Sequence, residues 1–157
     1  MLAVALQIID PRLPEWGFPH YGSDHAAGLD LHACIDAPLA VAPQAPAMLI
    51  SAGFAFHIAD PEWCALVLPR SGLGHREGLV LGNAIGLIDA DYQGTCMISV
   101  WNRNPPGANP DTGILIQPGD RIAQLVFTRV ARPQFSIVND FAVKTSRQKG
   151  GFGSTGV

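Results

Sequence analysis

Short runs of apolar or alternating residues, each bounded by turn residues, make up most of the chain. Runs of this length predict β-strands, and no segment keeps the apolar spacing of an amphipathic helix. Gly, Pro and Asp cluster between the runs, where they mark turns. One short helical turn is predicted at 71–77. The predicted strands are 2–8, 29–33, 48–50, 54–58, 63–68, 97–101, 114–116, 122–127 and 135–138.

The close spacing of these strands favours an all-β fold, either a sandwich or a jelly-roll. The chain has 157 residues, the size of one domain, and 48% of them are hydrophobic. Its 17 glycines and 13 prolines are too many for a helix bundle. We therefore expect a single β domain.

Net charge and hydropathy argue against two classes of partner, nucleic acids and membranes. The net charge is −3, so the basic excess that nonspecific nucleic-acid binding requires is missing. Uninterrupted apolar stretches fall well short of the roughly 18 residues that span a membrane. We expect neither a nucleic acid nor a membrane as partner.

The cysteines and histidines give no sign of a disulfide framework or a zinc site. Three widely spaced cysteines and an N-terminus without a signal-peptide pattern predict a reduced, cytoplasmic protein. His20, His25 and His32 lie close together, but their spacing is not that of a zinc-ligand pair. We expect them to be ordinary surface or core histidines.

The C-terminal segment 144–157 differs from the rest of the chain, because it contains almost nothing that could build a core. Both lysines of the chain lie here, together with Arg147 and Phe152. We do not expect the Gly-x-Gly-x-x-Gly pattern at 151–156 to be a dinucleotide site, because that motif works only between a strand and the start of a helix, and no helix is predicted here. The residues alone leave two interpretations open, a solvated tail or an arm for an anionic ligand with a flat ring.

Two internal segments carry candidate chemistry. Segment 69–74 places Arg70, Ser71 and the backbone of Gly72 at a strand end, where they can cradle phosphate oxygens. Segment 86–94 holds Asp89 and Tyr92 in a tight hairpin, and a carboxylate beside a polyanion can deprotonate a water molecule. Plain turn chemistry explains either segment equally well on its own.

Two further polar groups add to this picture. The Asn83 amide has both a donor and an acceptor, which suits a pyrimidine edge. Segment 117–124 brings polar side chains to a strand start, with a structural Asp120–Arg121 pair as the alternative interpretation. From the residues alone, we expect a soluble β protein with a phosphate-anion site and a C-terminal arm.

In this order, the segments resemble the motifs of the trimeric dUTPases (dUTP nucleotidohydrolases), over essentially the full chain length. The five matching motifs are 27–33, 69–74, 86–94, 118–124 and 147–156. The resemblance implies a jelly-roll (β-clip) domain at 1–143 that forms a homotrimer, and an arm at 144–157 that closes a neighbouring active site. It also implies Mg²⁺-dependent hydrolysis of dUTP to dUMP and pyrophosphate.

The resemblance also implies residue roles. Asp89 would be the general base, with Asp91 the next candidate, and Tyr92 would stack under the deoxyribose. Asp30 would support the site, and Mg²⁺ would be held by phosphates and water rather than directly by the protein. The uracil edge would be read by Asn83 and by the hairpin backbone from Gly86 to Met97. The remaining substrate contacts would be Arg70, Ser71, Gly72, Gln117, Arg147, Phe152, Gly153, Ser154 and Thr155.

Two other functions remain open. A dCTP deaminase-like enzyme would share the fold but use a glutamate base, for which Glu62 and Glu77 are the mid-chain candidates. A catalytically inactive dUTP-binding regulator would keep the pocket without turnover. The complete glycine-rich fifth motif favours the hydrolase.

Overall fold

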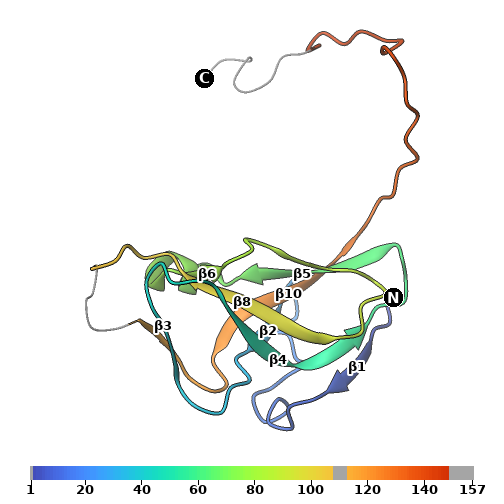
Figure 1. Cartoon of the computed structure of the whole chain (residues 1–157). Helices are drawn as coiled ribbons and strands as arrows, with labels where there is room; N and C mark the ends of the chain where they lie inside the picture. Colours follow the sequence, from blue (N-terminus) through green and yellow to red (C-terminus); the bar gives the residue numbers. More distant parts are fainter. Residues whose placement is uncertain (1, 108–112, 149–157) are drawn as a thin grey trace.

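The structure is a computed structural model that describes residues 2–107 and 113–148. Within these residues the chain forms ten strands and one wide helical turn (Figure 1). The elements are β1 (Ala5–Ile8), β2 (Leu29–His32), β3 (Leu39–Val41), β4 (Met48–His57), β5 (Trp63–Pro69), η1 (Leu73–Glu77), β6 (Leu79–Leu81), β7 (Gly86–Ile88), β8 (Thr95–Asn102), β9 (Ile114–Ile116) and β10 (Arg121–Arg129).

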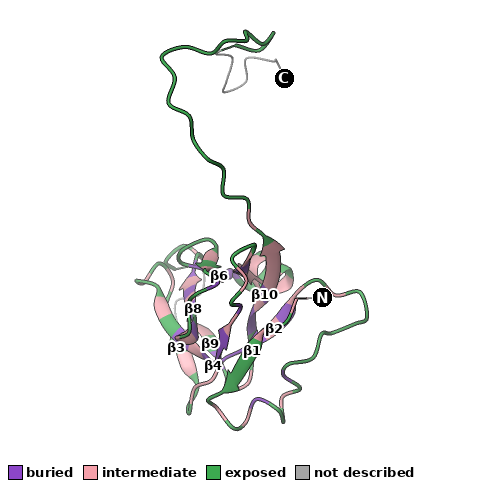
Figure 2. Cartoon of the chain, turned by 90° about the vertical axis from the view of Figure 1, so that its right-hand side faces the viewer, coloured by how far each residue is buried: buried purple, intermediate pink, exposed green. Residues whose placement is uncertain are grey.

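Two four-stranded antiparallel sheets make the body of the molecule. One has the strand order β1-β4-β8-β6 and the other β2-β10-β5-β7, while β3 pairs with β9. The core lies between the sheets, with Phe54 and Ile98 from the first and Leu31 and Leu125 from the second all fully buried (Figure 2). This arrangement confirms the predicted all-β sandwich.

β4 is one strand where the sequence predicted two. Gly53 adopts φ +77, and its carbonyl oxygen accepts hydrogen bonds from the amides of Ile9 (2.9 Å) and Asp10 (2.8 Å). A Cβ at this position would lie 2.4 Å from the Cys34 sulfur, so only glycine fits. The strand therefore bends through a bulge at Gly53 and continues, rather than ending at the polar residues around it.

Sequence patterns missed β3, β6 and β7, each of three residues. Such short strands exist because longer partners supply their hydrogen bonds: β9, β8 and β5 respectively. The helical turn predicted at 71–77 is present, and the Gly74 amide donates to the Arg70 carbonyl at 2.9 Å. Across the described residues, no helix is long and apolar enough to cross a membrane.

The strand predicted at 135–138 is absent from the described chain. Residues 131–148 are all exposed, and they run away from the body after β10 (Figures 1 and 2). A strand needs a neighbour for its backbone hydrogen bonds, and this segment has none in the single chain described. The prediction identified an apolar segment correctly but supplied no partner for it.

Candidate active site

An ion-pair cluster joins three elements at one end of the second sheet. Asp30 on β2 accepts from Arg70 Nε at 3.1 Å and from Arg121 Nη1 at 3.1 Å. Arg70, which follows β5, also donates from Nη1 to the carbonyl oxygen of Arg121 at 3.1 Å. Two guanidinium groups thus share one carboxylate, leaving a net positive charge and spare N–H donors.

The strand order brings these residues together. β10 lies between β2 and β5, and its Gln124 is the register partner of both Asp30 and Leu68. The Gln124 amide donates to the Pro69 carbonyl at 3.0 Å, which fixes the chain immediately before Arg70. Gly28 leaves room for this side chain, because a Cβ there would lie 2.5 Å from Gln124 Oε1.

The turn that carries Gln117 is tied to the same strand end. The Asp120 carboxylate accepts a hydrogen bond from the backbone N–H of Gln117 at 2.8 Å. The turn also exchanges two backbone hydrogen bonds with Ala33, directly after β2 (2.8 and 2.9 Å). The alternative interpretation, a structural Asp120–Arg121 pair, is therefore wrong: Asp120 closes its own turn, while Arg121 reaches across to Asp30.

A cavity of about 250 Å³ opens beside this cluster. Arg70, Arg121 and Asp120 line its polar side, and apolar residues such as Leu79 and Ile116 line the rest. Ser71 and Gly72 follow Arg70 at the start of the helical turn. Charged donors beside a small hydroxyl and a glycine backbone can bind phosphate oxygens.

The second group of predicted residues lies around β7: Asn83 precedes this strand, Gly86 begins it, Asp89 and Tyr92 follow it, and Met97 lies on β8. Gly86 is the register partner of Val67, and a Cβ on it would lie 3.0 Å from the Val67 Cβ. In the turn, the Tyr92 amide donates to the Asp89 carbonyl at 3.2 Å, and the Tyr92 hydroxyl donates to the Thr95 carbonyl at 3.2 Å. The side chains of Asn83, Asp89, Tyr92 and Met97 are exposed.

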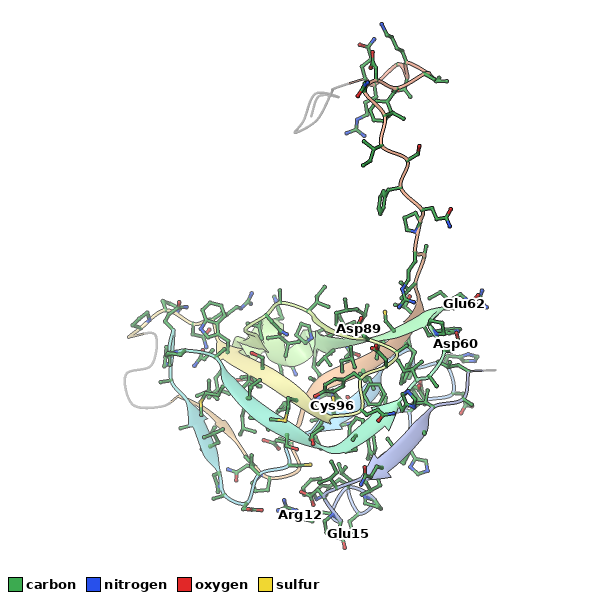
Figure 3. All side chains as sticks on the ribbon, turned by 45° about the vertical axis from the view of Figure 1, so that its right-hand side comes forward. Arg12, Glu15, Asp60, Glu62, Asp89 and Cys96 are labelled. Carbon is green, nitrogen blue, oxygen red and sulfur yellow. The ribbon has the colours of Figure 1, made fainter. Side chains whose placement is uncertain are left out.

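One chain does not bring Asp89 and Arg70 together. β5 and β7 are antiparallel, and Ala65 pairs with Ile88, so Asp89 lies at the start of β5 while Arg70 follows its end. Six residues of strand separate these positions, about 20 Å at about 3.3 Å per residue. Figure 3 shows Asp89 toward the side where Asp60 and Glu62 precede β5.

The C-terminal contacts are only partly described. Arg147 lies on the exposed segment that leaves the body. Phe152, Gly153, Ser154 and Thr155 lie outside the described residues. Within the described part of the chain, no group of three or more His, Cys, Asp or Glu side chains is placed to hold a metal ion.

Sequence reasoning missed the roles of Arg121 and Gln124. Both lie in a recognised motif, but only the register of β10 against β2 and β5 shows that they hold Asp30 and Pro69. His32 was also set aside as ordinary, yet it is buried beside Asp30. Its position within the first motif, 27–33, was the one signal in the sequence that could have drawn attention to His32.

Comparison with known proteins adds a family to this geometry. The dUTPase family model matches residues 14–156. The chain is 52% identical to a Tolumonas auensis protein named deoxyuridine 5'-triphosphate nucleotidohydrolase, and the match covers 99% of both chains. It is 51% identical to a Burkholderia multivorans protein of the same name, over 96% of both chains.

Solved structures of similar fold come from bacteriophages of Staphylococcus. The 80alpha phage dUTPase with dUpNHpp aligns over 100% of both chains with a TM-score of 0.81 and 23% identity. A mutant dUTPase from phage phi11 of S. aureus, described with a structural Mg(II) ion, aligns over 90% of this chain and 99% of that one, with a TM-score of 0.74 and 21% identity. These likenesses support the jelly-roll fold.

Proposed function

The chain belongs to the dUTPase family, and from this premise we propose that it hydrolyses dUTP to dUMP and pyrophosphate. The observation that carries the proposal is the Asp30–Arg70–Arg121 cluster beside the Gln117 turn. Its paired guanidinium groups offer several N–H donors in fixed positions, which suits the oxygens of a polyphosphate. Family membership supplies the nucleotide.

The reaction places water on the α-phosphorus, with pyrophosphate as the leaving group. We assign Asp89 as the base that takes the proton from this water, because a positioned carboxylate that solvent can reach can accept it. Arg70, Ser71, Gly72 and Gln117 bind the phosphates. Asn83 and the hairpin backbone near Gly86 and Met97 bind the uracil, and Tyr92 packs against the deoxyribose.

Mg²⁺ fits this assignment as an ion carried by the substrate. It prefers oxygen ligands, keeps several waters and is commonly held through substrate phosphates. The described carboxylates nearest the proposed phosphate site are already engaged: Asp30 by two arginines and Asp120 by the Gln117 amide. The ion would neutralise phosphate charge while the protein orients the nucleotide.

We also propose that the working enzyme is a homotrimer with shared active sites. Asp89 and Arg70 lie at opposite ends of β5, too far apart in one chain to act on one triphosphate. A second copy can bring its Asp89 hairpin to the Arg70 end of the first. A third copy can then contribute the arm at 144–157, with Arg147, Phe152, Gly153, Ser154 and Thr155 closing the site.

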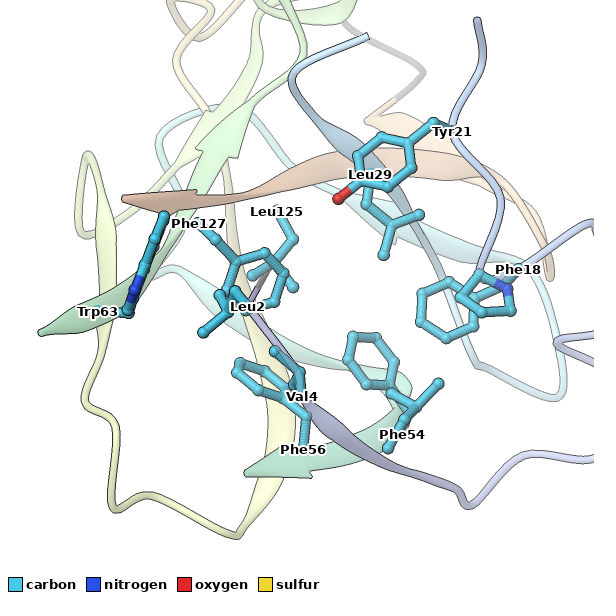
Figure 4. Close-up of a pocket in the computed structure, with 12 residues that line it drawn as sticks. Leu2, Val4, Phe18, Tyr21, Leu29, Phe54, Phe56, Trp63, Leu125 and Phe127 are labelled. Carbon is cyan, nitrogen blue, oxygen red and sulfur yellow. The ribbon is translucent and has the colours of Figure 1, made fainter. Parts of the chain in front are cut away.

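Exposed apolar surface gives independent support for assembly. A cavity of about 460 Å³ opens between the edge strands β1 and β2 (Figure 4), and the side chains of Leu6 and Tyr21, 41% and 50% exposed, are among those that line it. Beyond β10, Phe135 is 89% exposed and Ile137 98% exposed. Apolar surfaces of this extent mark contacts with another chain.

The division of the chain follows from these assignments. Residues 1–143 form the jelly-roll domain and its contacts with neighbouring copies, and residues 144–157 form the arm. Cys34, Cys64 and Cys96 are free thiols, which suits a reducing compartment, so we assign the enzyme to the cytoplasm.

The test is pyrophosphate release from dUTP, dCTP, dTTP and UTP, measured in parallel with and without Mg²⁺. We expect release from dUTP with Mg²⁺ and at least about 10²-fold less from the other three, because a closed pocket rejects extra groups and leaves wrong polar edges unpaired. Ammonia from dCTP would instead identify a deaminase. Tight dUTP binding without turnover would identify a regulator.

A further inference from the structure

His32 lies on the outer face of β2, beside the candidate phosphate site. Successive side chains of a strand point to opposite faces, so Leu29 and Leu31 enter the core while Asp30 and His32 face the other way. His32 is nevertheless only 5% exposed, because Trp16 covers it with ring centroids 5.9 Å apart. A titratable ring is thus enclosed at the back of the Asp30–Arg70–Arg121 cluster.

The position of His32 links both parts of the phosphate site. Two residues before it, Asp30 holds Arg70 and Arg121. One residue after it, Ala33 is hydrogen-bonded to the turn that presents Gln117. Trp16 also packs against that turn, since a Cβ on Gly119 would lie 2.9 Å from the indole ring. A change at His32 therefore reaches the arginines and the Gln117 turn together.

The imidazole is not satisfied in its site. Its Nδ1 atom is buried and has no hydrogen-bond partner among the described residues. Buried polar atoms are nearly always paired, so an unpaired one calls for a reason.

The surroundings of His32 act on its pKa in opposite directions. Burial lowers the pKa of His32 below its usual 6.5, the negative charge of Asp30 acts in the opposite direction, and Arg121 and Arg70 lower the pKa further. The Asp120 carboxylate, on the adjoining turn, already accepts a hydrogen bond from the backbone N–H of Gln117. The folded site therefore favours the neutral imidazole.

We propose that His32 is a positioning residue that must be neutral for Asp30 to hold Arg70 and Arg121 in their phosphate-binding orientation. When His32 gains a proton, it becomes a third cation competing for the same carboxylate, and the two arginines lose their shared partner. Loss of phosphate affinity at mildly acidic pH follows. This inference rests on the proposed function, because Arg70 contacts phosphate only if the substrate is a nucleotide.

The first measurement needs no substitution in the site. Ring signals of the full-length protein are followed by NMR from about pH 8 to about pH 5, with and without saturating dUpNHpp and Mg²⁺. If the ligand binds the neutral form about tenfold more tightly, the His32 pKa falls by about one unit on binding. An unchanged or raised pKa would overturn the proposal.

Two variants locate the effect. His32→Gln identifies the His32 signals by their loss and stays neutral at every pH. Asp30→Asn removes the one attractive charge, so the His32 pKa should fall further. If the pKa of His32 were the same in Asp30→Asn as in wild type, the proposed coupling between His32 and Asp30 would be contradicted. This readout is independent of turnover, so it stands even if no substrate is hydrolysed.

The kinetic test compares KM for dUTP across the same pH range in wild type, His32→Gln and the exposed control His25→Gln. Protonation of dUTP itself affects all three equally. The KM of wild type and His25→Gln should rise about tenfold more at acidic pH than that of His32→Gln, with a smaller difference in kcat. Parallel KM profiles would overturn the proposal, whereas absence of hydrolysis by wild type at any pH would defeat the proposed function instead.

Discussion

The two ends of β5 differ in how firmly contacts within one chain fix the candidate site residues. At the end that precedes Arg70, ion pairs and the Gln124 amide fix the side chains against each other. At the other end, Asp89 and Tyr92 are exposed on a turn that is held through its backbone, by the hydrogen bond from the Tyr92 amide to the Asp89 carbonyl and by one from the Ala59 amide to the Ala90 carbonyl. The side chains of the first region are fixed before any ligand binds, whereas under the proposed function the second becomes a site only when it meets another copy. Under that proposal, chemistry that needs both ends requires more than one copy.

The largest effect is expected at the exposed end. Asp89→Asn removes the proposed base while keeping the shape of the side chain, so kcat should fall by roughly 10²–10⁴. Binding of dUpNHpp, measured by calorimetry, should change little. The matched control is Asp91→Asn, which alters the neighbouring exposed carboxylate and should stay within a few-fold of wild type. A near-normal rate for Asp89→Asn, with loss in Asp91→Asn, would transfer the role to Asp91.

The fold at both ends of β5 was largely predictable, because strand runs and turn residues are local signals. The predicted 63–68 and 122–127 strands agree closely with β5 and β10. The contacts among Asp30, Arg70 and Arg121 were not predictable, since they depend on β10 lying between β2 and β5, which no single segment encodes. The fate of 135–138 was missed for a related reason: its apolar pattern is local, but its partner is not.

A direct test of the comparison mixes two inactive variants. Arg70→Ala damages one end of β5 and Asp89→Asn the other, and each homotrimer should be nearly inactive. If a site takes Arg70 and Asp89 from different copies, random co-expressed trimers have about a quarter of their sites intact, and should recover about a quarter of the wild-type rate. The control is to mix the two purified homotrimers without subunit exchange, which should recover nothing. Failure of co-expressed trimers to recover activity would place both residues in one chain's site.

A smaller effect is expected at the organised end. Asp30→Asn removes the charge that Arg70 and Arg121 share, so the guanidinium groups repel and lose their fixed orientation. The KM for dUTP should rise about tenfold, the equivalent of about 1.4 kcal/mol of binding free energy. Thermal stability should change little, because ion pairs this exposed contribute about 0–1 kcal/mol.

The control for this effect is Asp36→Asn. Asp36 is an exposed carboxylate that pairs with Arg12 at 3.2 Å, outside the Arg70 cluster. It should leave KM unchanged. Equal KM values in Asp30→Asn and wild type would mean that Asp30 only holds β2 to β10 and does not prepare the arginines.

The smallest effect separates the hydroxyl of Tyr92 from its ring. Tyr92→Phe removes only the 3.2 Å hydrogen bond to the Thr95 carbonyl, which lies at a partly exposed surface. The free energy of unfolding should fall by about 1 kcal/mol or less, because water replaces the lost partner. The preference for dUTP over UTP should persist, since the proposed contact with the deoxyribose is made by the ring. Tyr92→Ala keeps neither, and should lose much of that preference. If Tyr92→Phe alone abolished the discrimination, the hydroxyl would be reading the sugar, and the exposed hairpin would be more organised for its substrate than its contacts within one chain indicate.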